Sequence, residues 1–151
     1  MPNSQVILIC LGHELRGDDS AALIVLQRLK KKHPELFSYY HHSGDITSLM
    51  EVWKNKAVLI VDAVDSRQYE VGTILFLDPY NDPSITWDTK ASSSHALSLD
   101  TALKLSSEFD CKPSSIGIYG IVGKDFSIGQ TPSPEVRNAC IELENILIDK
   151  S

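Results

Sequence analysis

Three polar residues stand where a catalytic or metal site is expected in a chain of 151 residues. Asp19 comes soon after an apolar run at residues 6–11, and Asp62 directly follows a second apolar run at residues 57–61. His95 stands where a polar stretch meets a helical pattern. Two carboxylates and one imidazole form a plausible three-ligand set for Zn²⁺, Ni²⁺ or another borderline divalent ion.

Each of these residues also has an ordinary structural interpretation. Asp18, next to Asp19, is well suited to be the N-cap of the helix that follows, where acidic residues meet the positive end of the helix dipole. Asp62 could equally cap a turn after its strand, and a lone histidine is a weak signal. From the residues alone, structural and metal-binding roles both remain open.

Hydrophobic periodicity predicts which elements carry these residues. The continuous apolar runs are typical of strands buried on both faces, whereas a more polar run at residues 35–42 suits the edge of a sheet. Residues 57–61 and 73–77 are too close for a crossover helix, so these two strands are predicted to be antiparallel. The predicted strands are residues 6–11, 35–42, 57–61, 73–77 and 114–122, and the predicted helices are residues 20–32, 46–54, 96–109 and 134–148.

This order of elements predicts an α/β fold with a mixed, mainly parallel sheet and helices on both faces. No boundary divides the chain, so a single domain over residues 1–151 is expected. Open α/β sheets place ligand sites at the carboxyl ends of their strands, where Asp19, Asp62 and His95 are expected to converge on one metal. The long loop at residues 78–94, which contains Tyr80 and Trp87, is expected to border this site and to contact a partner.

Composition and charge exclude several classes of function. The formal net charge is −6, and the basic run at residues 30–32 is better explained as a solvated helix end than as a nucleic-acid patch. No apolar stretch approaches the length of a membrane span. Three cysteines without a CxxC spacing favour a reducing cytoplasm, and Cys10, inside a predicted strand, is expected to be an inert thiol. No nucleophile paired with a histidine can be assigned.

Four segments together resemble the nickel-iron hydrogenase maturation proteases, and the similarity covers nearly the whole chain. They are Gly12 with Asp18-Asp19, the LIVDAV run containing Asp62, Ser94-His95-x-Leu97-x-Leu99, and the closing segment at residues 129–136. The resemblance implies a three-layer α/β/α sandwich whose mainly parallel five-stranded sheet contains one antiparallel strand. It also implies an endopeptidase that removes a C-terminal extension from the hydrogenase large-subunit precursor once nickel has been inserted.

The same resemblance assigns roles to residues. Asp19, Asp62 and His95 would bind the metal, which is nickel carried by the substrate, although another divalent ion could substitute. Asp18 is a candidate general base, or a residue that supports the metal ligands. The expected partner is the hydrogenase large-subunit precursor, with no nucleic acid and no membrane involved.

The chain departs from the family pattern in its loops. His13 replaces the usual Asn, His42-Ser43-Gly44 replaces an Asp-Gly-Gly type element, and the usual proline is absent from residues 121–125. These differences predict altered loops for positioning the substrate. Two alternatives remain: a phosphoacceptor domain of the response-regulator receiver type, and a family member that binds the precursor without cleaving it. The predicted antiparallel strand does not suit a receiver.

Overall fold

The computed structural model describes residues 5–12, 17–42, 45–65, 68–81 and 94–150, and for residues 94–98 the backbone alone. Ten elements follow one another along these residues. They are β1 (Ile7–Leu11), the 3-10 helix η1 (Gly17–Ser20), α1 (Ala21–Lys32), β2 (Ser38–His42), α2 (Ile46–Trp53), β3 (Ala57–Asp65), β4 (Ile74–Leu77), α3 (Ser94–Glu108), β5 (Ser115–Gly123) and α4 (Pro134–Lys150).

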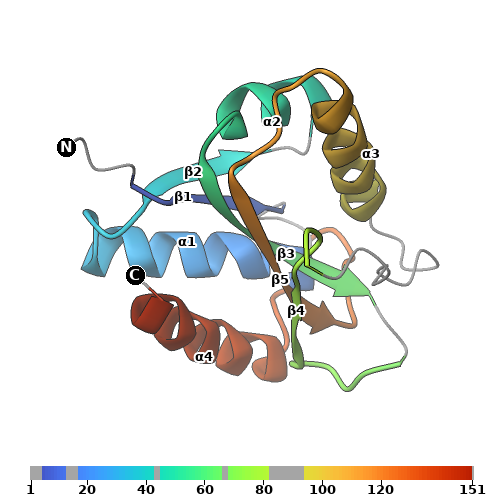
Figure 1. Ribbon diagram of the computed structural model, residues 1–151. Helices are drawn as coiled ribbons and strands as arrows, with labels where there is room; N and C mark the ends of the chain where they lie inside the picture. The colour runs from blue at the N-terminus through green and yellow to red at the C-terminus, as the bar shows by residue number, and fades with distance from the viewer. Residues whose placement is uncertain (1–4, 13–16, 43–44, 66–67, 82–93, 151) are drawn as a thin grey trace.

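The five strands form one sheet in the order β2-β1-β3-β5-β4. All neighbouring strands are parallel except β4, which runs antiparallel to β5 at one edge. Helices α1 and α4 pack together on one face of the sheet, and α2 and α3 pack together on the other (Figure 1). This arrangement confirms the mainly parallel α/β/α sandwich, with the polar strand at an edge as predicted. It also excludes a receiver, whose sheet is wholly parallel in the order 2-1-3-4-5.

Alternation along the strands divides the apolar interior into two layers. Leu8, Cys10 and Val61 belong to the core under α1 and α4. Ile9 and Ile60 belong to the core under α2 and α3. Because successive strand residues face opposite sides, Asp62, two residues after Ile60, lies on the α2–α3 face.

The helix starts show which capping predictions hold. Asp45 is the N-cap of α2, as expected, and its carboxylate accepts a hydrogen bond of 3.1 Å from the Ser48 amide. The prediction that Asp18 caps α1 is wrong, since the N-cap is Ser20 and Asp18 lies two residues earlier in η1. The Asp18 carboxylate is instead engaged by a distant segment, described below.

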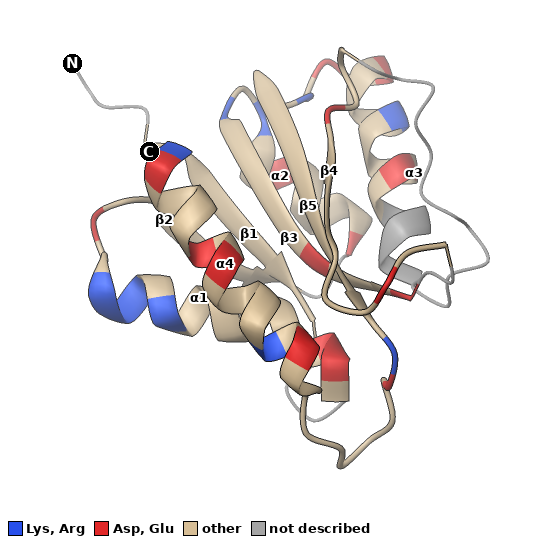
Figure 2. Cartoon of the chain, turned by 90° about the horizontal axis from the view of Figure 1, so that it is seen from below, with Lys and Arg blue, Asp and Glu red and all other residues tan. Residues whose placement is uncertain are grey.

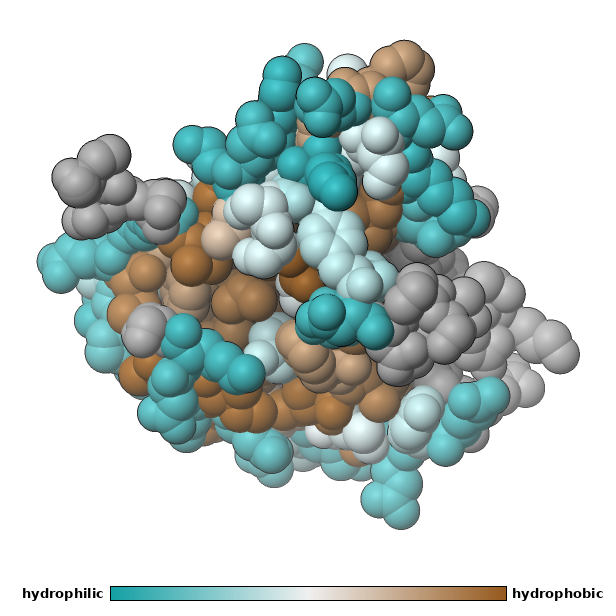
Figure 3. Space-filling view, in the orientation of Figure 1, coloured by the Kyte–Doolittle hydropathy of each residue, from teal (hydrophilic) through white to brown (hydrophobic). Residues whose placement is uncertain are grey.

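The surface is mixed in character. Apolar residues (brown in Figure 3) extend across the middle of the face seen in Figure 1, and polar residues surround them. Within the described ranges, no helix combines the length and the apolarity that a membrane crossing requires.

Candidate active site

Asp62 lies deeper in the sheet than the sequence predicts. The strand was expected to stop before it, but β3 continues to Asp65, because β5 pairs with it along its full length. The register still places Asp62 level with the carboxyl end of β1: Cys10 pairs with Val61, so Asp62 lies beside Leu11, the last residue of that strand. The Asp62 side chain has no exposure to solvent, and its Oδ1 accepts a 2.8 Å hydrogen bond from the Ala63 amide. Its partner on β5 is Gly120, which adds no side chain beside it.

Asp19 reaches the same end of the sheet through η1. This short helix packs against β3, and its Asp19 side chain is partly exposed. A Cβ on Gly12, which directly follows β1, would lie 2.3 Å from the Asp19 carbonyl oxygen. A glycine at this position is therefore what allows the turn carrying Asp19 to sit against the end of β1.

The direction of α3 places the backbone of His95 on this side of the molecule. The segment after α3 returns to the amino ends of the strands, where the Asn55 amide donates to the Lys112 carbonyl and the Ser114 amide donates to the Lys56 carbonyl. A helix that ends at the amino edge must begin toward the carboxyl edge, and His95 is the second residue of α3. Figure 1 shows this helix on the face of the sheet to which Asp62 belongs. The His95 side chain lies outside what the structure describes.

Asp18 occupies a different environment from its neighbour. It is fully buried, and its carboxylate accepts hydrogen bonds from the backbone amides of Lys124, Asp125 and Ser133. This burial argues against the predicted role as a general base, since a general base must reach the substrate. Figure 2 shows that acidic residues (red) gather where α1 and α4 begin, at the end of the sheet that holds this contact.

The thiols do not add a nucleophile to the site. Burial, followed by the negative charge of Asp62, raises the pKa of Cys10 far above its ordinary value. Burial likewise raises the pKa of Cys140 to about 12, although the Arg28 charge opposes the shift. The predicted burial of Cys10 is confirmed, and a raised pKa favours the protonated thiol, which is a poor nucleophile.

Two histidines of β2 lie near this edge. His41 Nε2 is 3.1 Å from the Gly12 carbonyl oxygen, and His42 is half-buried. The pKa of His42 lies below its ordinary value, because the effect of burial exceeds the opposing effect of the Asp45 charge. His13, Ser43 and Gly44, where the sequence departs from the family pattern, lie outside the described residues.

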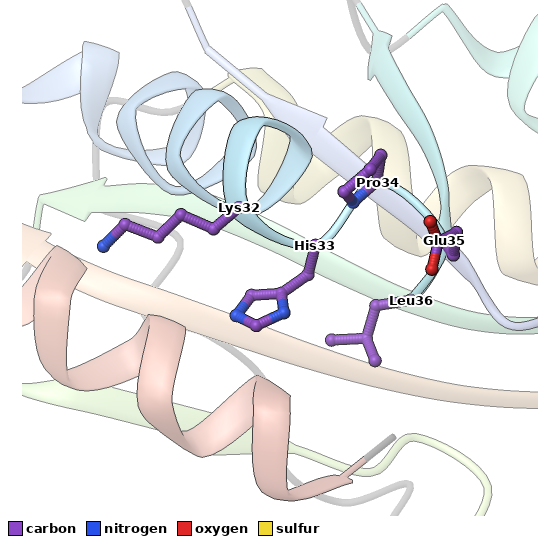
Figure 4. A pocket seen from close by; sticks show the side chains of 5 residues that line it. All are labelled: Lys32, His33, Pro34, Glu35 and Leu36. Atoms are coloured by element: carbon purple, nitrogen blue, oxygen red, sulfur yellow. The ribbon is translucent and has the colours of Figure 1, made fainter.

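Among the side chains that the structure describes, no three His, Cys, Asp or Glu residues form a group able to hold a metal ion. The described side chains include those of Asp19 and Asp62 but not that of His95. The shared metal site therefore stays a prediction. One pocket lies elsewhere: it is lined by Lys32, His33, Pro34, Glu35 and Leu36 at the far end of α1 (Figure 4), and none of the predicted site residues belongs to it.

The loop at residues 78–94 was expected to border the site, but Tyr80, its first aromatic residue, contacts another part of the molecule. The Tyr80 hydroxyl donates a 2.7 Å hydrogen bond to the Pro113 carbonyl, and Lys112 Nζ lies 5.8 Å from the centre of its ring. Both partners precede β5, so Tyr80 lies at the amino edge, away from the candidate site. Trp87 and the rest of the loop lie outside the described residues.

The sequence analysis named the segment after β5 as a loop that departs from the family pattern, but it missed the contact of this segment with Asp18. Lys124, Asp125 and Ser133 contact Asp18 through backbone amides, which are available on every residue type except proline. In the structure, glycines on both sides allow this contact: a Cβ on Gly123 would lie 2.6 Å from the Asp18 Cβ, and one on Gly17 would lie 2.4 Å from the Asp125 carbonyl oxygen.

Comparison with known proteins gives an independent result. A family model described as hydrogenase maturation protease matches residues 43–150, which is most of the chain. Curated protein sequences give no match.

Solved structures resemble the chain over nearly its whole length. HybD, a NiFe hydrogenase maturation protease from Thermococcus kodakarensis, is 24% identical with a TM-score of 0.76, covering 96% of this chain and 97% of that one. The hydrogenase maturating endopeptidase HybD from E. coli is 17% identical with a TM-score of 0.74, covering 97% and 94%. An endopeptidase from Escherichia coli solved in solution is 16% identical with a TM-score of 0.80, covering 96% and 90%.

These structural likenesses confirm the fold, and the family model identifies the family. The chain belongs to the hydrogenase maturation protease family.

Proposed function

We propose that this protein is an endopeptidase that removes the C-terminal extension from the large-subunit precursor of a nickel-iron hydrogenase after nickel has been inserted. The observation that carries the proposal is family membership over residues 43–150. The reaction is hydrolysis of one peptide bond, and the nickel belongs to the substrate. Three free cysteines, two of them buried, suit action in a reducing cytoplasm.

In this proposal, Asp19, Asp62 and His95 recognise the nickel that the precursor carries. Support comes from the elements on which they lie: η1 packs against β3, Asp62 faces the α2–α3 side, and α3 begins toward the same edge. Two carboxylate oxygens and an imidazole nitrogen are ligands that a borderline divalent ion accepts. Zn²⁺ or another such ion would therefore also bind these side chains.

The buried carboxylate of Asp62 is the strongest single support for a site at this position. A carboxylate is costly to remove from water, so an acidic residue inside an apolar strand calls for a compensating role. A structural role is the alternative, because Asp62 Oδ1 also bonds the Ala63 amide.

The test is incubation of the purified chain with nickel-loaded large-subunit precursor, followed by mass spectrometry of the product. Cleavage should yield one shortened large subunit and one released peptide whose masses sum to that of the precursor plus one water. The same precursor prepared without nickel should remain intact. No product from the nickel-loaded precursor, or equal cleavage of both forms, would contradict the proposal.

A second candidate function is binding of the precursor without cleavage. The departures from the family pattern at His13, at residues 42–44 and at residues 121–125 favour it, since they fall in segments expected to position the substrate. A stable complex with the nickel-loaded precursor, detected by size-exclusion chromatography without any shortened product, would support this candidate instead.

A further inference from the structure

The carboxylate of Asp18 accepts four hydrogen bonds from the segment that connects β5 to α4. Its Oδ2 accepts from the Lys124 amide at 2.8 Å, the Asp125 amide at 3.2 Å and the Ser133 hydroxyl at 3.3 Å. Its Oδ1 accepts from the Ser133 amide at 2.7 Å. One fully buried carboxylate thus holds both ends of the connection from β5 to α4.

The backbone around Asp18 is fitted to the same contact. The Asp18 amide donates a 2.7 Å hydrogen bond to the Asp125 carbonyl, so the two segments bond in both directions. A Cβ on Gly17 would lie 2.4 Å from the Asp125 carbonyl oxygen, and one on Gly123 would lie 2.6 Å from the Asp18 Cβ. The close approach therefore depends on glycine on each side.

The next residue along the chain, Asp19, lies in the same short turn. Its carbonyl oxygen lies against Gly12 at the end of β1, where a Cβ added to the glycine would be only 2.3 Å away. The turn is therefore held by β1 on one side and, through Asp18, by the segment after β5 on the other. A turn of four residues has little rigidity of its own, since helices this short are marginal without tertiary contacts.

From this arrangement we propose that Asp18 is a positioning residue: its buried carboxylate fixes the η1 turn so that Asp19 is held ready for the nickel carried by the precursor. The inference rests on the proposed function, since it assigns Asp18 a role through Asp19. Residues that orient metal ligands in this way typically change metal affinity by about 10–100-fold when they are removed.

The alternative is that Asp18 contributes to stability alone, and the chain offers a matched control for that case. Glu144 of α4 is also a buried carboxylate, with 3% exposure, and it pairs with Arg28 and Lys32 near the other end of α1. Both carboxylates join the α1 side of the molecule to the C-terminal part of the chain. Only Asp18 is next to Asp19, so Glu144→Gln should lower stability without affecting nickel recognition.

The measurement is the nickel preference, defined as the Kd for nickel-free precursor divided by the Kd for nickel-loaded precursor. Both are obtained by calorimetry, with precursors whose scissile bond is made uncleavable and at a temperature where every variant is folded. Asp18→Ala should lower this preference about 10–100-fold. Asp18→Asn should lie between Asp18→Ala and the native protein. Its amide oxygen can still accept from Lys124 and Asp125, but its NH₂ group then faces the Ser133 amide, which is also a donor.

Coupling to Asp19 separates positioning from stability. In an Asp19→Ala background, adding Asp18→Ala should change the nickel preference less than about twofold, since the residue through which Asp18 acts is gone. Glu144→Gln should leave the preference unchanged in both backgrounds. An equal loss from Asp18→Ala in both backgrounds, or no loss in either, would overturn the inference.

Amide hydrogen exchange of the free chain tests the inference apart from the proposed function. Asp18→Ala should speed exchange at the amides of Asp18, Lys124, Asp125 and Ser133, whereas Glu144→Gln should leave them protected. Unchanged exchange across residues 17–20 in Asp18→Ala would overturn the inference even if the protein processes its precursor. Failure of the native chain to discriminate nickel would instead overturn the proposed function, and these exchange rates would still decide whether Asp18 fixes the turn.

Discussion

Asp62 combines full burial with a position inside an otherwise apolar strand. Burying a carboxylate costs free energy, and Asn, which is neutral and of nearly the same size, avoids the cost of removing a charge from water. We therefore predict that Asp62→Asn keeps or raises the free energy of unfolding, measured in urea. Processing of the precursor should fall by about 10³-fold, which is the effect of losing several kcal/mol of interaction with a metal. Parallel losses of stability and processing would indicate a structural role.

His95 should be required for processing but not for folding. It is the second residue of α3 and follows a polar stretch, so its replacement removes no residue of the described core. An imidazole binds a metal only in its neutral form, so processing should decline as the pH falls and histidine becomes protonated. Processing rates of His95→Ala and of the native chain between pH 5 and pH 8 test this. Native rates in the variant would refute the role of His95 in metal recognition.

The three cysteines should differ sharply in reactivity. Cys111 is partly exposed, whereas Cys10 and Cys140 are buried with pKa values raised by burial. At pH 8 a thiol reagent should label Cys111 first and reach the other two only on unfolding, because the thiolate is the reactive form. Mass spectrometry of tryptic peptides gives the order of labelling. Cleavage of the precursor should survive Cys10→Ala, and its loss in a folded variant would reopen the case for a thiol nucleophile.

At the scale of elements, the contact between α1 and α4 includes an ionic cluster beside its apolar core. Glu144 Oε2 accepts a 2.9 Å hydrogen bond from Arg28, and Glu144 Oε1 lies 3.3 Å from Lys32 Nζ. Burial by itself would raise the pKa of Glu144, but the bonds from Arg28 and Lys32 outweigh burial and hold the pKa below its ordinary value.

A lowered pKa in the folded state fixes the sign of the effect of pH on stability. The contribution of Glu144 is fully present above the pKa of the unfolded chain, about 4.3, and disappears as the pH falls through the lower pKa of the folded state. Glu144→Gln should therefore cost about 1–2 kcal/mol at pH 7 and much less at pH 2.5. Urea unfolding at the two pH values checks this, and an equal cost at both would contradict it.

The sequence predicted the elements well where apolar periodicity was unbroken. The order of strands and helices and the antiparallel β4 follow from run lengths and from the short connection before residue 73. The end of β3 was misplaced because Asp62 interrupts an apolar run, and only pairing with β5 extends the strand past it. The predicted strand at residues 35–42 begins instead at Ser38, after a turn that contains the buried Phe37.

The candidate site was predictable to a lesser degree, for a physical reason. Asp62 can be selected because it follows an apolar strand in sequence, and Asp19 because it belongs to a recognisable motif. The partners of Asp18 are backbone amides more than a hundred residues away, at Lys124, Asp125 and Ser133. Backbone amides are the same on almost every residue type, so these bonds could not be recognised from the residues, and local capping rules assigned Asp18 to α1 instead.

At the scale of the whole molecule, the two ends of the sheet differ in what they hold. The carboxyl end brings together η1, the β5–α4 connection and the buried Asp62. The amino end holds the tail of α3, the Tyr80 contact with Pro113 and the basic end of α1. Contacts between segments distant in sequence concentrate polar groups at the carboxyl end, which is where a polypeptide substrate would meet them.

This division predicts where the precursor binds. On addition of nickel-loaded precursor, amide exchange should slow at residues 17–20 and 124–133, since docking excludes solvent from the carboxyl end of the sheet. Residues 30–36 at the far end of α1 serve as the control within the same chain and should not change. Nickel-free precursor should protect the first two segments less, because the interactions with the metal are missing. Protection confined to residues 30–36 would show that recognition uses another surface. Equal protection by both forms of the precursor would show that recognition does not involve the nickel.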